Sequence, residues 1–97
     1  MKYTVLFSPF AKEDKNSIQK YLTQFKPGTP RRFIAALKEQ IAKLKDNPFL
    51  YPEYPENNEY RHMSVGNYIV FYKVNDSEKH IRIYRILRAS WDLPKYL

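Results

Sequence analysis

The pattern of hydrophobic and polar residues predicts a sheet in the second half of the chain, within residues 60–87. β-Branched and aromatic residues alternate there with polar ones, and Gly66-Asn67 interrupts them. Both of these residue types tolerate a positive φ, so a two-residue loop between the runs indicates a tight hairpin turn. The expected cross-strand pairs are Val65 with Tyr68, Met63 with Val70 and Arg61 with Tyr72.

The two faces of this predicted sheet differ in chemistry, because side chains alternate along each strand. The apolar face, expected to lie under helices, comprises Val65, Met63, Tyr68, Val70, Tyr72, Val74, Ile81, Ile83, Arg85 and Leu87. The mixed face comprises Tyr60, His62, Ser64, Ile69, Phe71, Lys73, His80, Arg82, Tyr84, Ile86 and Arg88. Beyond residue 78 the assignment assumes a loop over residues 75–78, and a shift of one residue would exchange the two sets there.

Two amphipathic helices are predicted before the sheet. Ser8-Pro9 and Thr29-Pro30 are helix-opening pairs, and apolar residues recur after each at intervals of three and four. The first stripe is Phe10, Ile18, Tyr21, Leu22 and Phe25, with Asp14 as a polar interruption; the second is Phe33, Ile34, Leu37, Ile41 and Leu44. The link between them is short, so we expect an antiparallel helical hairpin that covers one sheet face.

Three further segments complete the predicted fold. Residues 2–7 (KYTVLF) are expected to add a strand to the sheet, and residues 47–59, with three prolines and three acidic residues, to form a structured turn region. The apolar residues after Leu87 are expected to fold back, although Pro94 excludes a long regular helix. The fold class is therefore α+β, with an N-terminal strand, an antiparallel helical hairpin and a three-stranded antiparallel sheet. At 97 residues the chain is expected to be one domain, residues 1–97.

Composition and charge narrow the function classes. The chain lacks cysteine, so disulfides and thiolate metal sites are excluded. No carboxylate or histidine cluster has metal-ligand spacing, and we expect no metal and no cofactor. The sequence shows neither a signal peptide nor a membrane-spanning run, so the expected location is the cytoplasm. The net charge of +7 favours nucleic acid, the ribosome or an acidic protein as partner.

Several charged residues are expected to form ion pairs or to bind a polyanion. Arg61 and Arg85 fall on the face predicted to lie under the helices, so each needs a buried partner, for which Asp14 and Asp92 are the candidates. Arg31-Arg32 occupies a helical first turn, where positive charge opposes the helix dipole. This placement indicates either polyanion binding or an ordinary surface position.

The mixed face carries the residue types that metal-free RNA cleavage requires. Such cleavage needs a base, an acid and cations that stabilise the phosphorane. His62 is the candidate base or acid, because histidine titrates near neutrality. Arg82 and Arg88 would hold phosphate, Lys73 would add charge, and Tyr60 or Tyr84 would stack on a base or assist catalysis. The alternative is a half-exposed sheet face without chemistry.

The order of segments and several short motifs resemble the RelE/ParE superfamily of bacterial toxins. The motifs are Asn47-Pro48 after the second helix, Tyr60-Arg61, Gly66-Asn67-Tyr68, Phe71-Tyr72, Arg85-Ile86-Leu87 and a tail containing Asp92. The likeness covers nearly the whole chain and favours the ParE-like branch. It implies a toxin of a type II toxin-antitoxin module, bound by a cognate antitoxin, with operator DNA contacted through the toxin-antitoxin complex.

The resemblance implies two alternative targets. RelE-like members cut messenger RNA on the ribosome without a metal, whereas ParE-like members inhibit DNA gyrase. In the RNA-cutting branch an arginine commonly follows the Gly-x-Tyr of the hairpin, and this chain has Ile69 there. In ParE-like tails an Arg-Asp pair is usual, and here Trp91 precedes Asp92. A ParE-like, non-enzymatic inhibitor is the first expectation, a ribosome-dependent endoribonuclease the second, and an inactive relative that acts only in antitoxin binding or repression the third.

Overall fold

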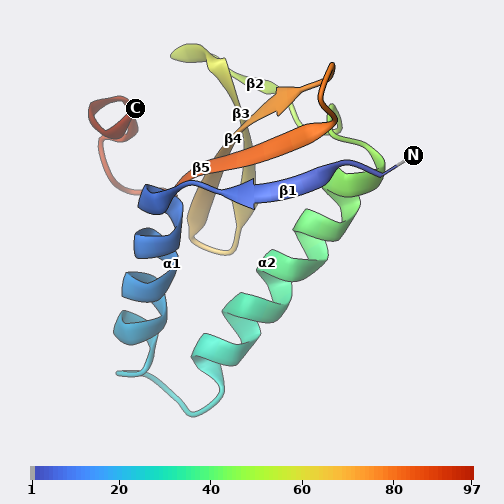
Figure 1. Cartoon of the computed structure of the whole chain (residues 1–97). Helices are drawn as coiled ribbons and strands as arrows, with labels where there is room; N and C mark the ends of the chain where they lie inside the picture. The colour runs from blue at the N-terminus through green and yellow to red at the C-terminus, as the bar shows by residue number, and fades with distance from the viewer. Residues whose placement is uncertain (1) are drawn as a thin grey trace.

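The fold consists of one five-stranded sheet with two helices on one side (Figure 1). The computed structural model describes residues 2–97. In chain order the elements are β1 (Thr4–Phe7), α1 (Pro9–Leu22), α2 (Thr29–Asp46), β2 (Glu53–Tyr54), β3 (Asn57–Val65), β4 (Tyr68–Asn75), β5 (His80–Arg88) and the 3-10 helix η1 (Leu93–Tyr96). The strand order is β1-β5-β4-β3-β2, with β1 parallel to β5 and the other pairs antiparallel. The predicted α+β class is confirmed, and the short edge strand β2 is an addition to it.

The first hairpin has the predicted register. Val65 lies opposite Tyr68, and Gly66 adopts a φ of 59° in the turn. A positive φ at this position is available to glycine without a steric penalty, which explains the tight connection. All three expected cross-strand pairs are present.

The second hairpin departs from the predicted register at two points: Asn75 pairs with His80, so the loop covers residues 76–79 rather than 75–78, and β5 contains a bulge further along. Tyr72 pairs with Ile83 but its neighbour Phe71 pairs with Arg85, which leaves Tyr84 as an extra residue. The predicted faces are therefore wrong after this point. Ile86 and Arg88 lie on the helix side, whereas Leu87 belongs to the opposite face.

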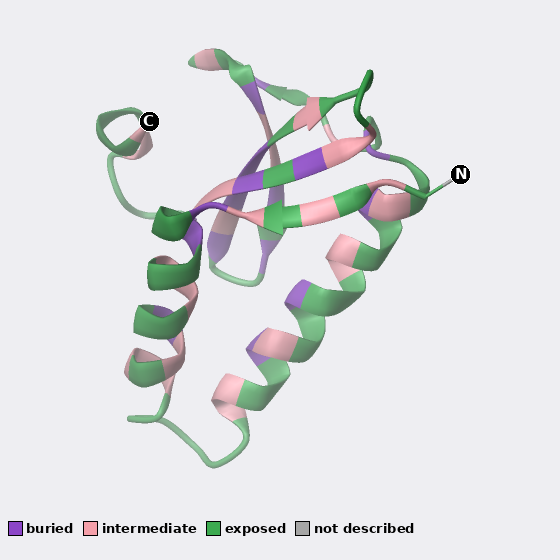
Figure 2. Ribbon diagram, in the orientation of Figure 1, coloured by how far each residue is buried: buried purple, intermediate pink, exposed green. Residues whose placement is uncertain are grey.

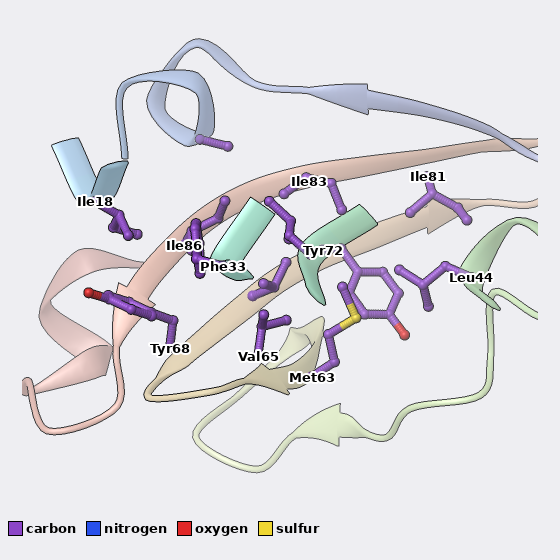
Figure 3. Packing of buried hydrophobic residues seen from close by; sticks show 13 residues of the cluster. Ile18, Phe33, Leu44, Met63, Val65, Tyr68, Tyr72, Ile81, Ile83 and Ile86 are labelled. Carbon is purple, nitrogen blue, oxygen red and sulfur yellow. The ribbon is translucent and has the colours of Figure 1, made fainter. Parts of the chain in front are cut away.

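The main core lies between the helices and the sheet. Figure 2 shows buried residues along the inner sides of the helices and along the central strands. In Figure 3, Leu44 of α2 points toward Tyr72, whereas Ile18 of α1 lies toward Ile86 and Tyr68. Burial of such apolar side chains stabilises the fold by about 1.5–3 kcal/mol for each large residue. The core sheet residues are Met63, Val65, Tyr68, Val70, Tyr72, Ile81, Ile83 and Ile86.

The helix ends follow the predicted pattern in part. Ser8 caps α1, since its Oγ accepts a hydrogen bond from the Ala11 N–H at 3.0 Å. The cap of α2 is Gly28 rather than Thr29, whose hydroxyl instead donates to the Lys26 carbonyl. Phe10 and Phe25, expected in the buried stripe, are 56% and 52% exposed. Phe25 lies beyond the end of α1, in the turn that leads to α2.

Candidate functional site

The mixed face of the sheet is largely occupied by a second hydrophobic cluster. Its buried members are Tyr54, Tyr60, Phe71 and Leu87, and Ile69, Tyr84, Leu93 and Leu97 pack against them. The tail after β5 contributes the last two of these residues, so it folds back over this face as expected. The position where the RNA-cutting branch has an arginine, Ile69, thus serves in packing.

Tyr60 lies at the centre of this face and is 5% exposed. Its ring centroid is 5.0 Å from that of Tyr84, and the Lys73 ammonium lies 4.7 Å from the Tyr60 centroid. Burial, with a hydrogen bond to Tyr84, raises the pKa of Tyr60 to about 12. Lys73 is also 3.8 Å from the carboxylate of Glu59. The structure thus brings Tyr60, Tyr84 and Lys73 together, but the Tyr60 ring is packed rather than open to a base.

The candidate base His62 is separated from the candidate phosphate ligand Arg82. His62 is on β3, where its Nδ1 lies 3.2 Å from the Pro52 carbonyl and its ring packs edge-on against Tyr54. Arg82 is on β5, exposed and opposite Lys73 of β4. Two inter-strand spacings separate β3 from β5, roughly 10 Å. The His62 ring packs on Tyr54, whereas Arg82 lies opposite Lys73, so the structure does not pair the candidate base with this cation.

Arg88 belongs to a different surface from the one expected. It lies on the helix side, where its Nη2 donates to the Tyr21 hydroxyl at 2.9 Å and its guanidinium is 4.9 Å from the Tyr21 ring centroid. The hydrogen bond to Tyr21 raises the pKa of Arg88. This side chain borders a hollow of about 240 Å³ lined by Asp14, Ser17, Ile18, Tyr21, Tyr68, Ile86, Arg88 and Trp91.

The hollow between α1, the end of β5 and the tail was not predicted from the sequence. We call it the α1-tail groove. Trp91 is 47% exposed at its edge and stacks on Tyr96, with 5.3 Å between ring centroids. Tyr21 was expected in the helix stripe, but nothing in its spacing signals a partner on β5. The bulge brings the two together, and a long-range register shift has no local signature.

Asp14 and Arg85 form a partly buried ion pair that ties α1 to the bulge. The Arg85 Nε and Nη2 donate to the two Asp14 carboxylate oxygens at 2.7 and 2.9 Å, and the Ile86 N–H donates to Oδ2 at 3.0 Å. Only 19% of the Arg85 side chain and 15% of the Asp14 side chain are exposed. Hydrogen bonding to Asp14 raises the pKa of Arg85. The polar interruption of the helix stripe thus has a structural partner.

Arg61 does not pair with either expected carboxylate. Its Nη1 donates to the Tyr51 carbonyl at 2.8 Å, and its guanidinium lies 5.0 Å from the Phe49 ring centroid. Asp92 is exposed and lies 3.9 Å from Lys95. A backbone carbonyl and an aromatic face therefore satisfy Arg61, because the turn region of residues 47–59 folds against β3.

The remaining expectations concern the helices and metals. Arg31 and Arg32 are exposed in the first turn of α2, where the Arg32 Nη2 lies 3.3 Å from Thr29 Oγ1. Within residues 2–97, no group of three or more histidine or acidic residues is placed to hold a metal ion. In the same range, no helix is both long and apolar enough to cross a membrane.

Comparison with known families decides the identity of this fold. The family model described as ParE toxin of type II toxin-antitoxin system, parDE, matches residues 5–93. The chain belongs to the ParE toxin family. This match spans both helices, β2 to β5, most of β1 and the start of the tail. Among curated proteins, no sequence matches this chain.

Solved structures show that the ParE-family chain shares its fold with toxins of both branches. The chromosomal ParDE system from P. aeruginosa has a TM-score of 0.74 at 19% identity, covering 92% of this chain and 98% of that one. The RelBE2 toxin-antitoxin complex from Mycobacterium tuberculosis has a TM-score of 0.67 at 22% identity, covering 91% and 99%. The YoeB/ParE toxin from Agrobacterium tumefaciens has a TM-score of 0.68 at 14% identity, covering 88% and 96%.

Proposed function

We propose that this ParE-family toxin arrests growth by binding and inhibiting DNA gyrase, and that a cognate antitoxin neutralises it by binding. One observation carries the choice of target. Much of the face that would have to cleave RNA is packed by the second hydrophobic cluster, and the ring of the candidate base His62 packs edge-on against Tyr54, two strands away from Arg82. A non-enzymatic inhibitor needs a binding surface and no acid-base pair, so this geometry supports gyrase inhibition over RNA cleavage.

The α1-tail groove is our proposed contact surface for gyrase. It presents Arg88, Tyr21 and the exposed Trp91, the residue types that contribute most to protein interfaces. The Asp14 carboxylate in its wall is already neutralised by Arg85. The groove is therefore cationic and aromatic, which favours an acidic segment of the partner.

A supercoiling assay with purified toxin and gyrase tests this function. We expect inhibition by the wild-type chain and a loss of about tenfold or more for Arg88→Ala or Trp91→Ala, a magnitude typical of interface anchors. The matched control is His62→Ala, which should inhibit as the wild type does. Unchanged supercoiling with folded wild-type toxin would overturn the proposal. Messenger RNA cut on ribosomes, and lost with His62→Ala or Arg82→Ala, would replace it with the endoribonuclease hypothesis.

Antitoxin binding is tested separately by co-expression with the neighbouring small gene. The support comes from related systems, since the RelBE2 structure from M. tuberculosis is a toxin-antitoxin complex. We expect restored growth and a complex that survives purification. Two proteins that neither rescue growth nor co-purify would contradict this part of the proposal without affecting the supercoiling result.

A further inference from the structure

The positive charge of the protein is concentrated on the helical hairpin and is not neutralised there. Residues 9–46 hold nine of the 17 Lys and Arg residues and four acidic residues, a net charge of +5. Two of those acids form ion pairs with residues outside the hairpin: Asp14 pairs with Arg85 of β5, and Asp46 pairs with Lys2. Among the described residues, the ion pairs involve none of the nine hairpin cations. The hairpin therefore carries a net positive charge that no described ion pair neutralises.

Part of this charge forms a continuous surface on the side of the hairpin that borders β1. Lys15, Lys38 and Lys45 line one hollow of about 410 Å³ there, together with apolar residues of β1 and α2. Lys12 and Lys15 line an adjoining hollow beside β1. The lining residues of both hollows include no carboxylate.

Lys38 and Lys45 also belong to a row of cations along α2 that extends this surface. Arg31, Lys38 and Lys45 are spaced seven residues apart, so they project from one side of the helix. The row is about 21 Å long at a helical rise of about 1.5 Å per residue. Lys38 and Lys45 line the hollow, whereas Arg31 lies outside it. Figure 1 shows α2 as a long helix that diverges from α1 toward the sheet. Arg31 and Lys38 are exposed, and Lys45 is half-buried.

We propose that this surface binds the phosphate backbone of duplex DNA, with Lys12, Lys15, Arg31, Lys38 and Lys45 as the contacting cations. A row of about 21 Å corresponds to roughly six base-pair steps of about 3.4 Å each. The length suits a rod of negative charge better than a short acidic peptide, which would fill only the hollow. The small side chains of Ala35 and Ala42 lie between the cations and allow a close approach.

The scarcity of exposed aromatic side chains on α2 favours duplex over single-stranded nucleic acid as the ligand. Single-strand binding uses aromatic side chains on which bases stack. Phe33 is the sole aromatic residue of α2 and is 8% exposed, so α2 offers no stacking platform. Phe7 lines both hollows, but the Lys15 ammonium already lies over its ring, 5.6 Å from the centroid. Contact with a duplex backbone requires only cations and is independent of base sequence. This surface is separate from the α1-tail groove, and the inference does not depend on gyrase as the target.

The expected salt dependence follows from counterion release. Five phosphate contacts give a slope of log affinity against log salt of about −4.5, so a fourfold increase in salt should weaken binding about 500-fold. Removal of two contacts should reduce the slope by about 1.8 and weaken binding about 60-fold at about 0.1 M salt.

Fluorescence anisotropy with a labelled duplex of about 20 base pairs tests the proposal on the purified full chain. The test variant is Lys38→Gln/Lys45→Gln, and the matched control is Lys43→Gln/Lys95→Gln, which removes the same charge from the other flank of α2 and from the tail. We expect the test variant to weaken binding as calculated and the control to change it less than about twofold. Circular dichroism would show that both remain folded.

Three outcomes would overturn the proposal. The first is a wild type that does not bind duplex DNA at low salt. The second is equal weakening by both variants, which would indicate only a diffuse net-charge effect. Tighter binding to single-stranded RNA, or to an acidic peptide, would assign the surface to a different partner. Each of these results is independent of the supercoiling assay.

Discussion

Removal of the Asp14 carboxylate tests how the helices are attached to the sheet. In the wild type this group accepts three hydrogen bonds, two from Arg85 and one from the Ile86 N–H. Asp14→Ala would leave the Arg85 charge, on a side chain only 19% exposed, with the Tyr96 carbonyl at 3.5 Å as its remaining hydrogen-bond partner. It would also remove the carboxylate oxygen that accepts from the Ile86 N–H next to the bulge.

The magnitude follows from burial. Breaking a fully buried ion pair from one side costs about 3–5 kcal/mol, and the residual exposure here places the cost near the lower limit, about 3 kcal/mol. For a domain of this size, 1 kcal/mol lowers Tm by about 4–8 °C, so we expect Tm to fall by about 12 °C or more. Asp14→Asn, which keeps an acceptor, should cost less.

Urea unfolding followed by circular dichroism measures this free energy. The matched control is Glu13→Ala, which removes a neighbouring exposed acid of α1 that takes part in no described ion pair. We expect the control to unfold within about 0.5 kcal/mol of the wild type, as most surface changes do. If Asp14→Ala were equally mild, the ion pair would not hold α1 to β5, and the reasoning would be refuted.

Three further predictions concern local features. Ser8→Ala should lower the free energy of unfolding by about 2 kcal/mol, because it removes the α1 cap and a 2.7 Å bond to the Tyr84 carbonyl; urea unfolding measures this, and a loss below about 0.5 kcal/mol would contradict it. Burial raises the pKa of Tyr60 and Tyr72 to about 12 from 10.0, so two tyrosines should ionise late in an absorbance titration. Above pH 10 the unfolded chain loses these two protons while the folded chain keeps them, so the free energy of unfolding should fall as the pH rises from 10 toward 12. Unfolding midpoints that stay constant over this range would refute the prediction. Gly66→Ala should cost about 1 kcal/mol from its φ of 59° alone, since no atom lies within 4 Å of the added Cβ, and a neutral effect on Tm would show a relaxed turn.

The first hairpin could be predicted because its register is a local property. Gly66-Asn67 fixes the turn, and the turn fixes every pair that follows it along β3 and β4. The helices were predictable for the same reason, since their apolar spacing is read within one element. The ion pair of Asp14 could also be predicted, because a carboxylate within an apolar stripe requires a partner.

The candidate site could not be predicted to the same extent. The faces beyond Tyr84 depend on a bulge whose partners, Ser8 and Asp14, lie more than 70 residues away in sequence. In the structure, Arg88 therefore lies on the helix side of the sheet and not on the mixed face. The strand β2 contains only two residues between prolines, so its sequence resembled a turn.

The position of β1 has a consequence for how the toxin is made. Thr4–Phe7 pairs with no strand except β5, and its partners are residues 80–83 near the end of the chain. During synthesis on the ribosome, the first strand therefore emerges long before its partner exists, and the core beneath it cannot close. The hollows beside β1 depend on this pairing, so they form only after β5 has been made.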